Sequence, residues 1–135
     1  MALPPLRAVG TLPPGKHHVA AEVFAAFPAT TMRRQLLNAA LRRFVEVVTR
    51  FALGTALVID GSYTTGKAEP ADIDLALFST GAGETAILQQ LQAEGVDLFL
   101  LDVFVSITVS QFDRWVQFFS ADRTGLDRGV VMLTM

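Results

Sequence analysis

The chain contains no cysteine, which excludes disulfide bonds and cysteine-ligated zinc sites. No apolar run approaches the roughly 20 residues that a membrane-spanning helix requires, and the first residues lack the apolar core of a signal peptide. A basic excess is also missing, because 11 lysines and arginines stand against 13 acids, so a general nucleic-acid coating role is not indicated. We expect a cytoplasmic protein with no membrane association.

What the sequence does contain is the composition of one folded domain. Of its 135 residues, 51% are apolar and 18% charged, which favours a globular chain over a disordered one. The paired prolines at Pro4-Pro5 and Pro13-Pro14 predict an irregular N-terminal arm over residues 1–18. Residues 19–135 are expected to form a single domain.

The spacing of apolar residues predicts helices and strands. The clearest helix covers 31–51, with Thr31 as a good N-cap and Gly54 as a plausible stop. Ser110 followed by Asp113 resembles a capping box that opens a later helix. Further helices are expected at 19–27, 84–94 and 110–119, and strands at 55–60, 72–78, 96–105 and 129–134. From the main helix onward the order is α-β-β-α-β-α-β, which predicts an α/β (α+β) fold with helices packed on a mixed sheet.

The most informative stretch joins a Gly-Ser pair to two aspartates. Gly61 and Ser62 follow a strand, where backbone N–H groups can approach a phosphate closely. Asp72 and Asp74 come ten residues later and point to one face, because side chains alternate along a strand. Two adjacent carboxylates repel each other unless a cation lies between them, and oxygen ligands suit Mg²⁺ or Mn²⁺. Metal-assisted nucleotidyl transfer needs this combination of phosphate cradle and carboxylate pair.

This pattern resembles the active-site signature of the DNA polymerase β-type nucleotidyltransferase superfamily, which includes small minimal nucleotidyltransferases. More narrowly, nearly the whole chain resembles a family of short bacterial proteins of unknown function grouped with that superfamily. The segments that carry this likeness are 12–17, 60–67, 70–75 and 118–130. Ala71 departs from the pattern, since asparagine is expected there, but the change removes no ligand.

The resemblance implies a nucleotidyltransferase-like fold and a role for each motif. The paired acids Asp72 and Asp74 would bind two divalent ions, and Gly61 with Ser62 would bind a triphosphate. A third acid would come from a later strand. Lys67 could also reach a phosphate, although a lysine in a polar loop is more often merely hydrated.

We predict that the third acid is Asp102 and not Asp97. Both lie in the expected strand 96–105, and a separation of five residues places them on opposite faces of the sheet. Asp102 is flanked by apolar residues, so burial of its carboxylate would be costly without a cation or strong donors. A structural Asp102 bonded to backbone donors is the alternative, and a bulge would undo the parity argument.

Two further groups of side chains have a functional and a structural interpretation. Arg33, Arg34, Arg42, Arg43 and Arg50 could face nucleic acid, but their helical angles scatter, which favours a solvated helix face. The aromatic residues Trp115, Phe118 and Phe119 lie at helical spacing, which favours a place in the core over a base-stacking platform.

Taken together, the motifs predict metal-dependent transfer of a nucleoside monophosphate from a nucleoside triphosphate to an acceptor hydroxyl. Mg²⁺ or Mn²⁺ is the expected cofactor. The alternative is a non-catalytic or regulatory protein, such as a toxin–antitoxin component, because several minimal nucleotidyltransferases act on or pair with a helical partner. The short chain would then bind such a partner or form a homo-oligomer. A degenerate domain that binds nucleotide without turnover is a third possibility.

Overall fold

The structure is a computed structural model that describes residues 6, 12, 15–20, 31–60, 70–79, 81–120 and 129–134. Its described elements are β1 (Gly15–Ala20), α2 (Met32–Arg50), β2 (Ala56–Asp60), β3 (Ile73–Phe78), α3 (Glu84–Ala93), β4 (Leu101–Ser106), α4 (Val109–Phe119) and β5 (Gly129–Thr134). The five strands form one sheet in the order β1-β5-β2-β3-β4. The outer pairs β1–β5 and β3–β4 are parallel, and β2 is antiparallel to both of its neighbours.

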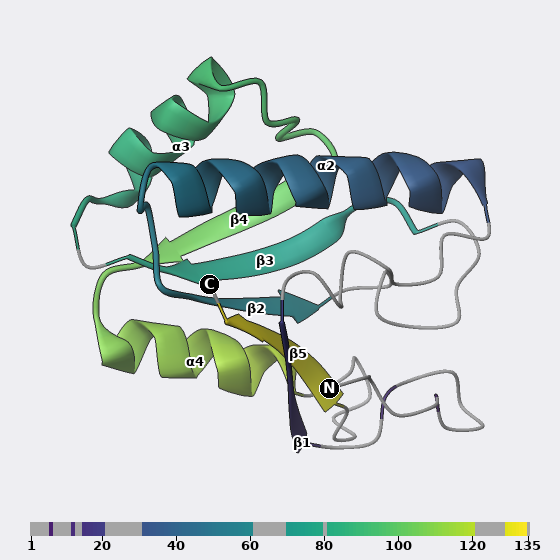
Figure 1. Ribbon diagram of the computed structural model, residues 1–135. Coiled ribbons are helices and arrows are strands. Elements are labelled where there is room, and N and C mark those ends of the chain that lie inside the picture. Colours follow the sequence, from purple (N-terminus) through teal and green to yellow (C-terminus); the bar gives the residue numbers. More distant parts are fainter. Residues whose placement is uncertain are drawn as a thin grey trace.

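The sheet is covered on both faces. Figure 1 shows α2 and α3 on one face and α4 on the other. Because side chains alternate along each strand, Ile73, Leu75 and Leu77 of β3 join the core beneath α2 and α3, whereas Ala76 joins the core beneath α4. The protein is therefore a mixed α+β fold, with three helices in its described part.

Helix α2 supplies the centre of the larger core. Phe44 and Leu37 are fully buried, and each such side chain contributes roughly 1.5–3 kcal/mol of burial free energy. The expected N-cap is confirmed, since the Thr31 hydroxyl accepts a hydrogen bond from the backbone N–H of Arg34 at 3.2 Å.

The C-terminus of α2 differs from the expectation. Ala52, with φ 51°, takes the left-handed position, and the N–H of Leu53 donates to the carbonyl of Val48 at 3.0 Å. This closing bond is that of a Schellman motif. Gly54, expected to stop the helix, instead lies where an added Cβ would be 2.7 Å from the carbonyl oxygen of Phe78. Close packing against β3 is the reason for glycine there.

The N-terminal prediction is partly wrong. Residues 1–18 were expected to be irregular, yet Gly15–Ala20 forms β1, paired in parallel with β5. The partner lies more than 100 residues away in the sequence, so local composition carries no signal for this pairing. The helix expected at 19–27 does not begin at Val19, which belongs to β1; its remaining residues, 21–27, lie outside the described part.

Two boundaries in the second half also need correction. The strand expected at 96–105 begins only at Leu101, because the preceding residues form a turn in which the Asp97 carboxylate accepts a hydrogen bond from the N–H of Phe99 at 2.9 Å. The N-cap of α4 is Thr108, two residues before Ser110 of the expected capping box, and the Thr108 hydroxyl accepts a hydrogen bond from the N–H of Gln111. A side chain that satisfies a nearby backbone donor sets each of these boundaries.

Within the described residues, no helix combines the length and the apolar character that crossing a bilayer would require.

The tight packing at Gly54 can be tested by substitution. Gly54→Ala should lower the free energy of unfolding by about 1–3 kcal/mol, because the methyl group collides with backbone as well as side chain. Gly81→Ala is the matched control, since an added Cβ there meets no atom within 4 Å. Urea unfolding followed by circular dichroism measures both values. Equal stability of the two variants would contradict the close approach.

Candidate metal centre

Three aspartates converge at one end of the sheet. One carboxylate oxygen from each of Asp72, Asp74 and Asp102 lies within 4.8 Å of the other two. Asp74 and Asp102 are register partners in the parallel pair β3–β4, and Asp72 lies directly before β3. Strand pairing and chain continuity together therefore position all three carboxylates.

The separation of these oxygens suits a divalent ion. Mg²⁺ holds its oxygen ligands at about 2.1 Å in octahedral geometry, so two ligands on opposite sides of one ion are about 4.2 Å apart. Hard carboxylate oxygens are the ligand type that Mg²⁺ and Mn²⁺ prefer. Asp72, Asp74 and Asp102 thus fit a magnesium or manganese site after small side-chain adjustments.

The backbone before Asp72 is held by an arginine from α2. The Nε of Arg33 donates to the carbonyl oxygen of Pro70 at 3.0 Å, and its Nη2 donates to that of Ala71. On the other side of Asp72, the N–H of Ile73 donates to the carbonyl of Leu100 at 3.0 Å. Asp72 therefore lies between two anchored backbone segments, although it belongs to no strand itself.

The arginines of α2 do not form a free basic surface. Besides the role of Arg33, Arg34 is only 4% exposed. Arg43 donates twice to the carbonyl oxygen of Glu94 and also pairs with Glu46 at 2.8 Å. The solvated-face interpretation thus holds for exposed Arg42 and Arg50, whereas the other three have structural contacts.

The closeness of the three carboxylates changes the pKa of Asp102. Partial burial raises the pKa of the Asp102 carboxyl above its usual value, and the negative charge of Asp72 raises it further. A bound cation would favour the ionised form of all three acids and so relieve this repulsion.

The choice of Asp102 over Asp97 agrees with the geometry, but the argument for it was wrong in two respects. Asp97 lies in a turn and not on the strand, so the parity argument does not apply to it. The Asp102 side chain is largely exposed, so water is kept from only part of its carboxyl group and apolar side chains do not enclose it. It reaches Asp72 and Asp74 because it lies opposite Asp74 on β4. Its role as a metal ligand stays a prediction.

A fourth acid was missed by the sequence reasoning. Asp60 is 3% exposed and is the register partner of Asp74 across β2 and β3. Directly opposite residues on neighbouring strands share a face, so Asp60, Asp74 and Asp102 form a row across three strands. The signal was present in the sequence: Asp60 ends an apolar strand immediately before Gly61.

The predicted phosphate-binding residues lie outside the described residues. Gly61, Ser62 and Lys67 belong to the segment 61–69 that connects Asp60 to Pro70. Both ends of that segment are described, and Asp60 at its start lies opposite Asp74. Strand β2 thus ends, at Asp60, on the side of the sheet that carries the acids.

Comparison with known proteins establishes the family. Residues 4–134 match a family of unknown function, DUF6932, and the chain belongs to this family. Neither the curated proteins nor the solved structures contain a match. The family carries no assigned activity, so a function must be argued from the site itself.

The electrostatic coupling of Asp72 and Asp102 gives a measurable prediction. In EDTA, the pKa of Asp102 should lie above the ordinary value of an aspartate side chain, and Asp72→Asn should lower it, because one of the two causes of the shift is removed. Carboxyl ¹³C chemical shifts followed against pH report each pKa. Asp97→Asn is the control and should leave the pKa of Asp102 unchanged.

The raised pKa of Asp102 also affects the stability of the metal-free protein, in a direction that depends on pH. Because the folded protein holds the Asp102 proton more tightly than the unfolded chain does, this carboxyl destabilises the metal-free fold at neutral pH. The destabilisation is relieved as the pH falls through the raised pKa. Asp102→Asn should therefore stabilise the metal-free protein at neutral pH, with a difference from the parent that shrinks on acidification.

Proposed function

We propose that this protein is a metal-dependent nucleotidyltransferase that transfers a nucleoside monophosphate from a nucleoside triphosphate to an acceptor hydroxyl. The observation that carries the proposal is the convergence of Asp72, Asp74 and Asp102 within 4.8 Å. Two of these acids were predicted as ligands from their spacing after Gly61-Ser62. The third, Asp102, was predicted because the resemblance to the polymerase β-type superfamily implies an acid from a later strand.

Different residues of the chain would have different roles in such a reaction. The three carboxylates would hold the cations, and the backbone of Gly61 and Ser62 would bind the phosphates. Divalent ions held there would supply positive charge against the phosphates and would lower the pKa of the attacking hydroxyl. The acceptor oxygen then bonds to the α-phosphorus, the bond from that phosphorus to the bridging oxygen breaks, pyrophosphate leaves, and the hydroxyl proton passes to water.

The proposal predicts that nucleotide binding depends on the acids. Asp72→Asn with Asp74→Asn keeps the side-chain shapes but removes the charges that hold the ions, so Mg²⁺-dependent binding of nucleoside triphosphates should weaken by at least about tenfold, or about 1.4 kcal/mol. Titration calorimetry in Mg²⁺ and in EDTA measures it. Asp97→Asn, which changes an acid outside the cluster, should bind like the parent.

Transfer itself requires a second assay. Each α-labelled triphosphate is incubated with the protein, Mn²⁺ or Mg²⁺ and host lysate, and label is sought on protein, RNA and small molecules. Transfer by the parent and none by the double variant would support catalysis. If the protein binds nucleoside triphosphates with a metal ion but transfers no label, it is a nucleotide-binding domain and the proposal that it is an enzyme is wrong.

Arg33 is proposed as a positioning residue. Arg33→Gln removes the bonds to Pro70 and Ala71, so the Mn²⁺ affinity of the site should fall several-fold, by roughly 0.5–1.5 kcal/mol per lost hydrogen bond. Arg42→Gln, an exposed arginine on the same helix, is the control. Electron paramagnetic resonance of free Mn²⁺ measures the affinity, and urea unfolding separates a local effect from loss of the fold. Unchanged Mn²⁺ affinity would remove Arg33 from this role.

Partner recognition is a second candidate function. Several large apolar side chains are exposed to solvent, among them Phe99 (97% exposed), Met32 (77%) and Val109 (62%). Exposed apolar groups of this size are typical of contact surfaces when they cluster. A homo-oligomer would appear as a mass above 14.6 kDa in light scattering, and Phe99→Ser or Met32→Ser would reduce it.

A further inference from the structure

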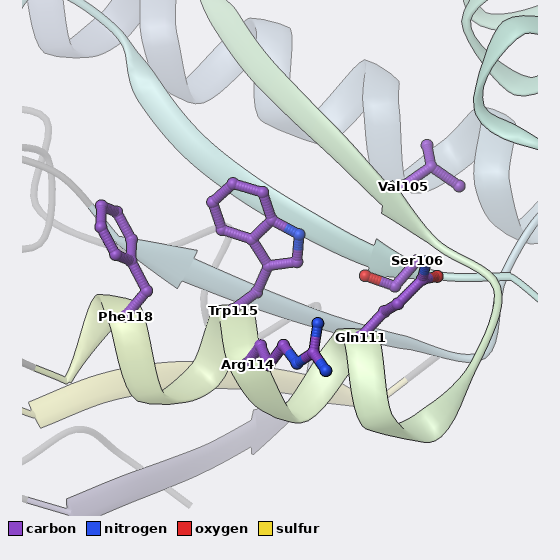
Figure 2. A pocket seen from close by; sticks show the side chains of 6 residues that line it. All are labelled: Val105, Ser106, Gln111, Arg114, Trp115 and Phe118. Carbon is purple, nitrogen blue, oxygen red and sulfur yellow. The ribbon is translucent and has the colours of Figure 1, made fainter.

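A cavity of about 390 Å³ lies between α4 and the end of β4. Its lining residues are Val105, Ser106, Gln111, Arg114, Trp115 and Phe118. In Figure 2, four of these side chains come from α4, and Val105 and Ser106 come from the end of β4. The volume falls in the range of small-ligand sites, which is about 300–1,000 Å³. None of these lining residues belongs to the cluster of Asp72, Asp74 and Asp102.

An unsatisfied hydroxyl lies in its wall. Ser106 is fully buried, and its Oγ has no hydrogen-bond partner among the described residues. The backbone carbonyl of Ser106 accepts from the N–H of Ser79 at 2.8 Å, so its backbone is held. A buried hydroxyl without a partner costs free energy that a ligand can recover. In Figure 2 the Ser106 oxygen points into the space beside Trp115.

The aromatic rings of this wall pack on one another and are partly uncovered. Trp115 stacks on Phe104 with ring centroids 4.2 Å apart, and Phe118 meets Trp115 edge-on at 5.8 Å. Phe118 is 70% exposed, which corrects the expectation that it belongs to the core; Phe119, 2% exposed, does belong there. A planar apolar group could lie against Phe118 and the edge of Trp115 at little entropic cost.

Polar groups border this wall. The side-chain oxygen of Gln111 accepts from the N–H of Ile107 at 3.1 Å, which orients its amide so that the NH₂ group is left to a ligand. Arg114 has no acidic or carbonyl partner in the described part of the chain. A hydroxyl, an amide and a guanidinium beside aromatic rings are the groups that bind nucleobases.

The cavity lies on the same sheet face as the acids. Alternation along β4 places Asp102, Phe104 and Ser106 on one face. Ser106 comes four positions after Asp102 on the strand, which is about 13 Å at 3.3 Å per residue. A ligand that spans both sites needs a charged end and a separate planar end, as a nucleoside triphosphate has.

We propose that this cavity binds the base of the nucleoside triphosphate whose phosphates lie at Asp72, Asp74 and Asp102. The base lies against Trp115 and Phe118, and its polar edge bonds to Ser106 and Gln111. The inference rests on the proposed function, and it adds that the base contributes to affinity and is selected by these residues.

The test compares ligands with and without a base. Trp115 is the only tryptophan of the chain, so its fluorescence reports on the cavity alone. Each of the four nucleoside triphosphates, and inorganic tripolyphosphate, is titrated in Mg²⁺ by calorimetry and by fluorescence. At least one triphosphate should bind about tenfold or more tightly than tripolyphosphate and quench Trp115, whereas tripolyphosphate should not quench it.

Ser106→Ala sharpens the test. It should weaken binding of the preferred triphosphate about fivefold to tenfold, the equivalent of one hydrogen bond, and leave tripolyphosphate binding unchanged. The melting temperature should stay equal or rise, because an unsatisfied buried hydroxyl is removed. Ser120→Ala is the control: its hydroxyl donates to the carbonyl of Val116 at 2.6 Å and does not line the cavity. Phe118→Ala, a change at an exposed position, should also weaken binding of the preferred triphosphate.

The outcomes separate the two proposals. If triphosphates and tripolyphosphate bind equally and Trp115 is not quenched, the base site is overturned and the metal centre stands. If Ser106→Ala and Phe118→Ala both bind the triphosphate like the parent, the base site is likewise overturned. If neither triphosphate nor tripolyphosphate binds, the proposed function fails and the base site fails with it.

Discussion

The parallel pairing of β3 with β4 is the constraint on which the candidate site depends. It sets Asp74 opposite Asp102, two like charges that would separate in a free chain. The neighbouring pairs in the same ladder, Ile73 with Leu101 and Leu75 with Val103, are buried beneath α2 and α3. A slip of one residue would turn these side chains to the other face. Burial of apolar pairs therefore holds the acids together against their repulsion.

The two faces of the sheet have different roles. The face under α2 and α3 contains most of the large buried side chains, among them Phe44, Leu75 and Leu91. The other face has the smaller core under α4, the row of acids and the cavity beside Trp115. The face under α2 and α3 thus provides most of the apolar burial. The face under α4 combines a smaller core with the acids and the polar groups of the cavity. Arg33 links them, because it comes from α2 and holds the backbone before Asp72.

Membership in a family of unknown function leaves the activity to be argued from residues. A carboxylate cluster alone is a common surface feature. Here the cluster lies at the end of the sheet where β2 ends, at Asp60, and on the same sheet face as a cavity with an unsatisfied hydroxyl at Ser106. These features have independent physical origins, which is why the ligand experiments can separate them.

Much of the fold could be predicted from local sequence. The period of α2, the strands around Asp60 and Asp74, and the N-cap at Thr31 all follow from interactions between residues near in the chain. The spacing of Asp72 and Asp74, two residues apart, likewise predicted that their carboxylates lie on the same face of the sheet.

Other features depend on contacts between distant segments, and for these the sequence alone was insufficient or misleading. β1 exists because β5 pairs with it, and the start of β4 is delayed to Leu101 by the turn at Asp97. The burial of Asp60 and the exposure of Phe118 depend on which elements cover them. By itself the sequence determined the helical and strand periods and the spacing of the acid pair. Only the tertiary structure decided which strands pair, and hence which acid joins that pair, because strand register is set by burial across the whole sheet.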